Sequence, residues 1–470
     1  MSWVATDDSP RLFPEFALAA ADCFAGAAPA PTPRRPLPRV ERLTLQGSEM
    51  SHRSLSFFGR PAAALLACLS LAALAAPAKA QLTVEALIGE AVSTSSQKYP
   101  DVENAIQRFT NQDFEAAREY LDRAKKKHPG LPPTSVTLAK MFMLARDAQR
   151  SRLFLEKAVA DHPEDPEAYL ILADQAFAGN RWTESEALFE KGDALTQQFD
   201  ANAQRKRNFE IRVLAGKAAV AQRRGHWEDA REYLKQWIEL DPENALAHQR
   251  LGGTLFQLDE VAQAYDEFAR SRELRSDLSH PYVALAQLHS AKGETEKARE
   301  NFEKAYQQES DNDATAQAYA TWLLQQREFD KAQEIANKLR EKNPESEAAL
   351  LMAGVVAQLK GERDEAEEAL AKLLTVNPSD AKATNLLALL LVDSPKVSDQ
   401  ERALRYAQVN AERFPNNPQT QVTLAWVQHK LGRRREADQA LQRGIQAGNL
   451  NADSRYLIAK ILADRDEKDR

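Results

Sequence analysis

The stretch Asp113-Phe114-Glu115-Ala116-Ala117 holds an aromatic residue followed, three positions later, by a small residue. The same arrangement returns in Arg181-Trp182-Thr183-Glu184-Ser185, in His226-Trp227-Glu228-Asp229-Ala230 and in Glu328-Phe329-Asp330-Lys331-Ala332. With the small residue as anchor, ten copies are found, at Ala117, Ser151, Ser185, Ala230, Ala264, Ala298, Ala332, Ala366, Ala403 and Ala437. The intervals are 34, 34, 45, 34, 34, 34, 34, 37 and 34 residues, which indicates an internal repeat.

Two further positions keep the same phase. Twelve residues after the anchor, six of the ten copies have proline, which cannot continue a helix interior. Twelve residues before it, most copies have a second small residue: Ala105, Ala139, Ala173, Ala218, Gly252, Ala286, Ala320, Gly354 and Ala425. Each period therefore predicts two amphipathic helices of about 12–14 residues that approach closely at their small residues. One such pair cannot bury its apolar face alone, so the pairs must stack.

This register resembles the tetratricopeptide repeat family over residues 98–451. The resemblance implies an all-α fold, a right-handed α-solenoid of about ten helix-turn-helix repeats. Eleven extra residues near 199–209 are close to three helical turns and are expected to lengthen the adjoining helices. Three extra residues near 392–399 are most simply a longer turn. Residues 452–470 are expected to form a C-terminal capping helix.

The first eighty residues have a different character. Residues 1–49 are rich in Ala, Pro and Arg, and we interpret them as a mis-called upstream extension. Residues 50–80 have the pattern of a signal peptide, with cleavage expected before Gln81, and residues 81–97 are a linker or first capping segment. We therefore expect export to the periplasm or cell envelope, with no transmembrane span after cleavage. Alternatively, Leu65-Leu66-Ala67-Cys68 is a lipoprotein box, and the mature chain is tethered to a membrane.

Composition and motifs argue against a catalytic, cofactor-binding or nucleic-acid-binding role. The net charge of −7 provides no basic footprint for nucleic acid. Both cysteines, Cys23 and Cys68, precede Gln81, and no motif for a nucleophilic, phosphate-binding or zinc site is present. No catalytic residue, cofactor or metal is predicted. The basic runs 125–127, 205–207 and 433–435 are expected to be solvated faces of helices.

The resemblance implies that the first helix of each repeat lines a concave groove for an extended peptide or a helix of a partner protein. The matching phases are occupied by Asp174, Phe177, Arg212, Gln222, Arg223, Gln249, Phe256, Gln287, Gln317, Thr321, Gln325 and Gln358. Amides and apolar residues together suit a peptide backbone with alternate side chains, although a merely solvated polar groove is an equal alternative. The predicted function is a non-enzymatic scaffold for protein–protein interaction. The alternatives are a lipoprotein subunit of an outer-membrane, secretion or pilus assembly machine, and an enzyme.

Overall fold

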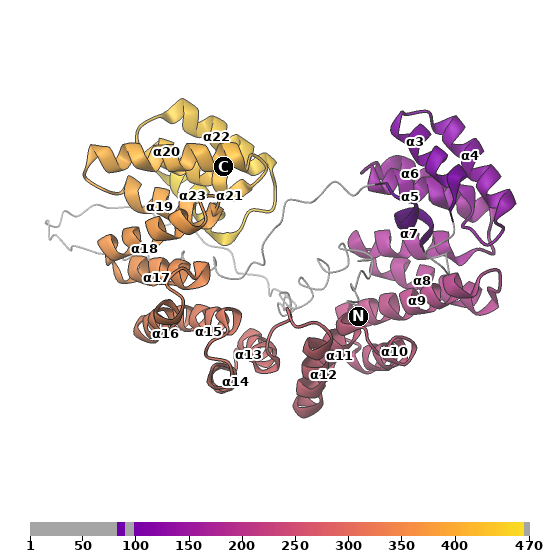
Figure 1. Ribbon diagram of the computed structural model, residues 1–470, viewed down its shortest axis with the longest axis horizontal. Coiled ribbons are helices and arrows are strands. Elements are labelled where there is room, and N and C mark those ends of the chain that lie inside the picture. Colours follow the sequence, from indigo (N-terminus) through magenta and orange to yellow (C-terminus); the bar gives the residue numbers. More distant parts are fainter. Residues whose placement is uncertain (1–81, 90–97, 465–470) are drawn as a thin grey trace, which may run out of the picture. The chain divides into compact units, whose positions relative to one another are not determined.

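The computed structural model describes residues 82–89 and 98–464. The expected upstream extension (1–49), the signal peptide (50–80), part of the segment 81–97 and the last six residues lie outside those ranges. Among the described residues there are 22 helices, and the predicted all-α fold of helix-turn-helix pairs is confirmed (Figure 1). No helix within these ranges is long and apolar enough to cross a lipid bilayer.

Ten consecutive helix pairs follow a short helix α2 (Val84–Ile88). The pairs are α3 (Pro100–Thr110) with α4 (Phe114–Lys127), α5 (Thr134–Leu144) with α6 (Ala148–Asp161), α7 (Pro166–Ala178) with α8 (Trp182–Gln198), α9 (Ala203–Arg224) with α10 (Trp227–Leu240), α11 (Ala245–Gln257) with α12 (Val261–Leu274), α13 (Pro281–Ala291) with α14 (Thr295–Gln308), α15 (Asp313–Gln325) with α16 (Phe329–Lys342), α17 (Glu347–Lys360) with α18 (Arg363–Val376), α19 (Ala381–Val392) with α20 (Val397–Arg413), and α21 (Pro418–Lys430) with α22 (Arg434–Gln446). A last helix, α23 (Ala452–Ala463), packs on α21 and buries Ile461.

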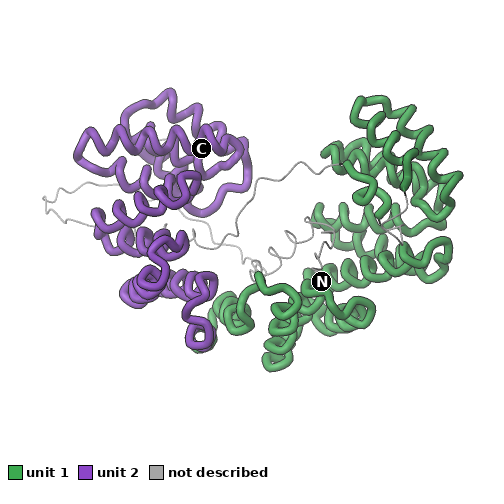
Figure 2. Tube along the Cα trace, viewed as in Figure 1, with its two compact units in different colours: residues 1–27, 73–301 green, residues 28–72, 302–470 purple. Residues whose placement is uncertain are grey.

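The chain forms two compact units (Figure 2). The described residues up to Asn301 belong to unit 1, and those from Phe302 onward belong to unit 2, so the division falls within α14. Within each unit, helices pack on their neighbours along the chain, as α7 does on α8 and α8 on α9 in unit 1, and α17 on α18 and α18 on α19 in unit 2. The core is therefore a row of helix–helix contacts rather than one central cluster.

The anchor residues lie where the two helices of each pair meet. All ten are at most 1% exposed. Opposite them, a Cβ added to Gly252 would stand 2.9 Å from the Phe268 ring, and one added to Gly354 would stand 2.6 Å from Leu370 Cγ. The small residues at this phase are thus required by the close approach of the helices.

The two insertions are accommodated mainly by helix. Helix α8 has 17 residues and α9 has 22, whereas the other first helices have 11–14 and the other second helices, α20 apart, have 13 or 14. Near 392–399, α20 begins six residues before its anchor Ala403 rather than three, and only four residues, 393–396, form the turn. The expectation of a simple longer turn was therefore wrong, because most of the extra length continues the helix.

Candidate protein-binding surfaces

The twelve residues predicted to line a groove all lie on first helices of pairs. Asp174 to Gln287 belong to helices of unit 1, and Gln317 to Gln358 belong to helices of unit 2. The spacings are three residues in α7, four in α15 (Gln317, Thr321 and Gln325) and seven in α11, which place those side chains on one face of each helix. In α9, Gln222 and Arg223 are adjacent and point in different directions.

In unit 1, α7 and α9 are joined by a charged pair on this face. Arg212 Nε donates a hydrogen bond to Asp174 Oδ2 at 2.8 Å, and the side chains are only 20% and 23% exposed. Farther along α9, Gln222 Nε2 donates to Thr254 Oγ1 of α11 at 2.7 Å. Arg250 Nη2 donates to Gln222 Oε1 at 2.8 Å. These polar groups are engaged with neighbouring repeats, so they stabilise the stacking of first helices.

The remaining unit 1 candidates differ in accessibility. Arg223 and Gln287 are exposed, and Gln249 is half-buried. Phe177 is half-buried, with its ring 5.0 Å from that of Trp182 in an edge arrangement.

The prediction that Phe256 lines the groove is wrong, because its side chain is only 1% exposed. Its ring packs edge-on against His289 and beneath the ammonium of Lys292, which stands 4.5 Å from the ring centre. It is therefore a core residue and is not presented to a ligand.

In unit 2, the predicted groove residues also include both buried and accessible side chains. Thr321 is only 8% exposed, and its hydroxyl donates to the Gln317 carbonyl at 2.6 Å, so its side chain is also withdrawn from a ligand. Gln325 is exposed, and Gln317 is half-buried. Gln358 is half-buried, and its Oε1 is buried without a hydrogen-bond partner among the described residues. The side chains of Gln317 and Gln325 thus remain within reach of a ligand.

A buried ion network lies where the eleven-residue insertion meets the preceding repeats. Arg205, at the start of α9, is 1% exposed, which corrects the expectation that the run 205–207 is a solvated face. Its Nη2 lies 2.8 Å from Asp165 Oδ2 and 2.8 Å from Glu167 Oε2 at the start of α7. The ammonium of Lys140 on α5 pairs with the second carboxylate oxygen of Glu167.

The electrostatics of this network follow from burial and pairing. Burial by itself would raise the pKa of the Glu167 carboxyl, but the positive charges of Lys140 and Arg205 outweigh burial and lower the pKa to about 2. The Arg205 guanidinium also lies 5.0 Å from the centre of the Phe199 ring and 5.1 Å from that of Phe209, both supplied by the insertion. No sequence signal distinguished this arginine from its neighbours in the run, the half-buried Lys206 and the exposed Arg207. We regard the network as a structural tie between three repeats.

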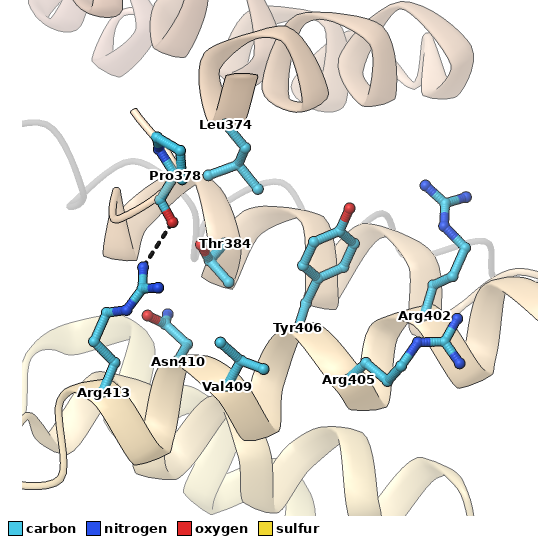
Figure 3. Close-up of a pocket in the computed structure, with 9 residues that line it drawn as sticks. All are labelled: Leu374, Pro378, Thr384, Arg402, Arg405, Tyr406, Val409, Asn410 and Arg413. Carbon is cyan, nitrogen blue, oxygen red and sulfur yellow. Dashed lines mark hydrogen bonds between the residues drawn. The ribbon is translucent and has the colours of Figure 1, made fainter. Parts of the chain in front are cut away.

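A pocket that the sequence analysis missed lies in unit 2, along α20 (Figure 3). It encloses about 430 Å³ between the end of α18, the start of α19 and the length of α20. Its charged lining residues are three arginines, Arg402, Arg405 and Arg413, and its apolar lining includes Leu374 and Val409. The signal that could have revealed it is the spacing of Arg405, Val409 and Arg413 at intervals of four, which places them on one helix face.

A second pocket, of about 630 Å³, lies in unit 1 near the turns of the first two repeats. Two arginines line it, Arg146 and Arg150. Arg150 is already engaged, because its guanidinium stands 4.8 Å and 4.6 Å from the ring centres of Phe114 and Phe142 and its Nε donates to Asp147 at 2.6 Å. In the part of the chain that the structure describes, no group of three or more His, Cys, Asp or Glu side chains is placed to hold a metal ion.

Comparison with known proteins identifies the repeat. One family model described as "Tetratricopeptide repeat" matches residues 137–198 and 215–277, and a second with the same description matches residues 289–359 and 323–390. No curated protein matches the chain in sequence.

Several solved structures are similar in fold. A tetratricopeptide repeat protein from Parabacteroides merdae is 17% identical, with a TM-score of 0.36 over 54% of this chain and 99% of that one. Yeast Tom70 is 12% identical, with a TM-score of 0.31 over 79% of this chain and 96% of its own. The pilF protein of Pseudomonas aeruginosa is 18% identical, with a TM-score of 0.28 over 48% and 97% of the two chains.

Proposed function

Because this chain is a tetratricopeptide repeat protein, we propose that it is a scaffold that binds a partner protein through the first helices of its repeats, in the periplasm or cell envelope. The observation that carries the proposal is the common phase of the polar side chains on these helices. Arg223, Gln287 and Gln325 are exposed there, while the neighbouring polar groups tie the repeats together. A rigid support with accessible amides suits the backbone of an extended peptide.

The location is supported by the sequence of residues 50–80, whose basic start, apolar centre and Ala-Lys-Ala end are typical of an export signal. The second candidate is a membrane-tethered subunit of an outer-membrane, secretion or pilus assembly machine, favoured by the Leu65-Leu66-Ala67-Cys68 stretch. The mass of the N-terminal peptide of the native protein separates them. A chain that begins at Gln81 supports the exported scaffold, and a lipid-modified Cys68 supports the tethered subunit. An intact start at Met1 or Met50 overturns both.

The binding surface is tested by photo-crosslinking in the full chain. A photo-reactive amino acid at the exposed position Gln325 should capture one partner as a covalent adduct, whereas the same residue at Lys157, exposed on the second helix α6, should not. Replacing both Gln287 and Gln317 by glutamate should reduce the yield of that adduct, because two amide donors become acceptors with negative charge.

The control is a measurement of folding, since neither Gln287 nor Gln317 is itself a buried side chain. Helical circular dichroism and the melting temperature should be unchanged in the double variant. An undiminished adduct in the double variant, or an equal adduct at Lys157, contradicts the proposal that the first helices bind the partner.

A further inference from the structure

The pocket along α20 carries positive charge that the described part of the protein leaves only partly compensated. Arg402 is paired with Glu367, whose Oε1 lies 2.7 Å from its Nη1, and with Asp399 at 3.5 Å. Arg413 Nη1 donates to the carbonyl oxygen of Pro378 at 2.6 Å, so its charge has no carboxylate partner within the described residues. Arg405 makes no hydrogen bond, ion pair or ring contact with any described residue. Two of the three guanidinium charges are therefore available to an anion.

The other polar groups of the pocket already have partners. Thr384 Oγ1 donates to the Asp380 carbonyl at 2.7 Å, and Asn410 Nδ2 donates to the Ala381 carbonyl at 2.9 Å. Asn410 is only 2% exposed, so it forms a fixed part of the wall. Because Thr384 and Asn410 are satisfied, an entering ligand meets donors at the arginines and at the hydroxyl of Tyr406, which also lines the pocket.

Apolar surface separates the two arginines. Val409 is 50% exposed, and it lies midway between Arg405 and Arg413 on the same face of α20. Leu374 approaches from α18, and Tyr406 projects from α20 about one turn before Val409, as Figure 3 shows. The surface therefore alternates a positive group, an apolar patch and a second positive group.

We infer that this pocket is a docking site for an acidic segment of a partner protein, with two carboxylate side chains on Arg405 and Arg413 and an apolar side chain on Val409 and Leu374. Arg405 and Arg413 are eight residues apart on α20, a rise of about 12 Å along the helix. Four residues of extended peptide span about 13 Å. The matching motif is thus two acidic residues four positions apart with an apolar residue midway between them. The positive pocket complements the negative charge of such a motif, because every charged residue that lines the pocket is an arginine. This positive charge is local to the pocket, since the whole chain carries a net charge of −7.

This site goes beyond the proposed function, since it uses a second helix, α20, and not the first-helix residues. A carboxylate peptide is favoured over an anionic membrane because the arginines border a recessed apolar pocket that admits a side chain. Vesicles are nevertheless included in the test, so that a lipid headgroup is distinguished from a peptide.

The experiment measures binding of a fluorescein-labelled peptide, Gly-Ser-Glu-Ala-Leu-Ala-Glu-Ser-Gly, to the full chain by fluorescence anisotropy. We expect saturable binding that weakens as salt increases. A peptide with glutamine for both glutamates should bind roughly tenfold more weakly or not at all, because charge-assisted hydrogen bonds are lost. Arg405→Gln and Arg413→Gln should each weaken binding of the glutamate peptide by roughly tenfold.

The matched control is Arg435→Gln, an exposed arginine of the same unit that has no partner among the described residues, and it should leave peptide binding unchanged. Gln287→Glu with Gln317→Glu should also leave it unchanged, so failure of this site and failure of the first-helix surface are told apart. The inference is overturned if the peptide does not bind, if Arg405→Gln and Arg413→Gln bind it as wild type does, or if anionic vesicles alone bind in an arginine-dependent manner.

Discussion

At the scale of single residues, the ion network around Arg205 holds four charged side chains almost entirely out of water. Moving a charge out of water costs several kcal/mol, and the cost is recovered only when each charge keeps its partners. Here Glu167 is 0% exposed and has two positive partners, Lys140 and Arg205, which in turn belong to different helices. Each member therefore depends on the others, and the network links α5, α7 and α9.

Replacing Glu167 by glutamine should lower the free energy of unfolding by about 3 kcal/mol, because the buried charges of Lys140 and Arg205 lose a carboxylate. Urea denaturation followed by circular dichroism measures the loss. The matched control is Glu190→Gln, an exposed glutamate on α8, which should change the free energy by less than about 0.5 kcal/mol. Equal stability of the two variants contradicts the assignment of a structural role.

The same residue predicts a pH dependence. Its pKa is lowered in the folded state to about 2, from an ordinary value near 4.5. A carboxyl with a lowered folded pKa contributes stability that is fully present above the unfolded pKa and is lost as pH falls through the folded pKa. The wild-type protein should therefore lose this contribution between about pH 4.5 and pH 2. The stability of Glu167→Gln should fall less steeply over that window, as measured by urea denaturation at a series of pH values; parallel profiles contradict the prediction.

At the scale of the element, the turn between the two helices of a pair follows one rule. In nine of the ten repeats the residue five positions before the anchor has a positive φ. The repeat of α19 and α20 lacks it, because its insertion makes that position helical. Glycine occupies the position in some repeats, such as Gly361 with φ +83°, and a side chain occupies it in others, such as Arg327 with φ +63°. Only glycine adopts this conformation without steric cost.

Arg327→Gly should therefore raise the free energy of unfolding by about 1 kcal/mol, and Gly361→Arg should lower it by a similar amount. The second change tests strain alone, because a Cβ at Gly361 would meet no atom within 4 Å. Both are read from urea denaturation midpoints of the full chain. A Gly361→Arg variant as stable as wild type rules out strain at this turn.

At the scale of the whole molecule, each of the two compact units is a series of interfaces between neighbouring helices. Stability in such a series is approximately a sum of local terms, so damage in one place is felt by its neighbours and decays along the chain. The two units therefore offer an internal comparison, with the ion network in unit 1 and the arginine pocket in unit 2.

Amide hydrogen exchange should report this locality. In Glu167→Gln, the amides of α5, α7 and α9 should exchange faster than in wild type, while those of α19 to α22 should be unchanged. Peptide-resolved mass spectrometry measures both in one sample. Faster exchange throughout unit 2 contradicts the nearest-neighbour description and indicates a single cooperative fold.

The helix pairs were predictable from the sequence, because the 34-residue register places small residues such as Ala230 and Gly354 at the phases where paired helices approach closely. The first-helix residues were also predictable in phase, since helical spacing decides which side chains share a face. The burial of Arg205 and Phe256, and the pocket bordered by Arg405 and Arg413, became evident only from the packed structure. The physical reason is that periodicity describes one helix at a time. The burial of a side chain depends on the neighbouring repeat: Arg205 is paired with Asp165 and Glu167 of the preceding repeat, and Phe256 packs against His289 of the following one.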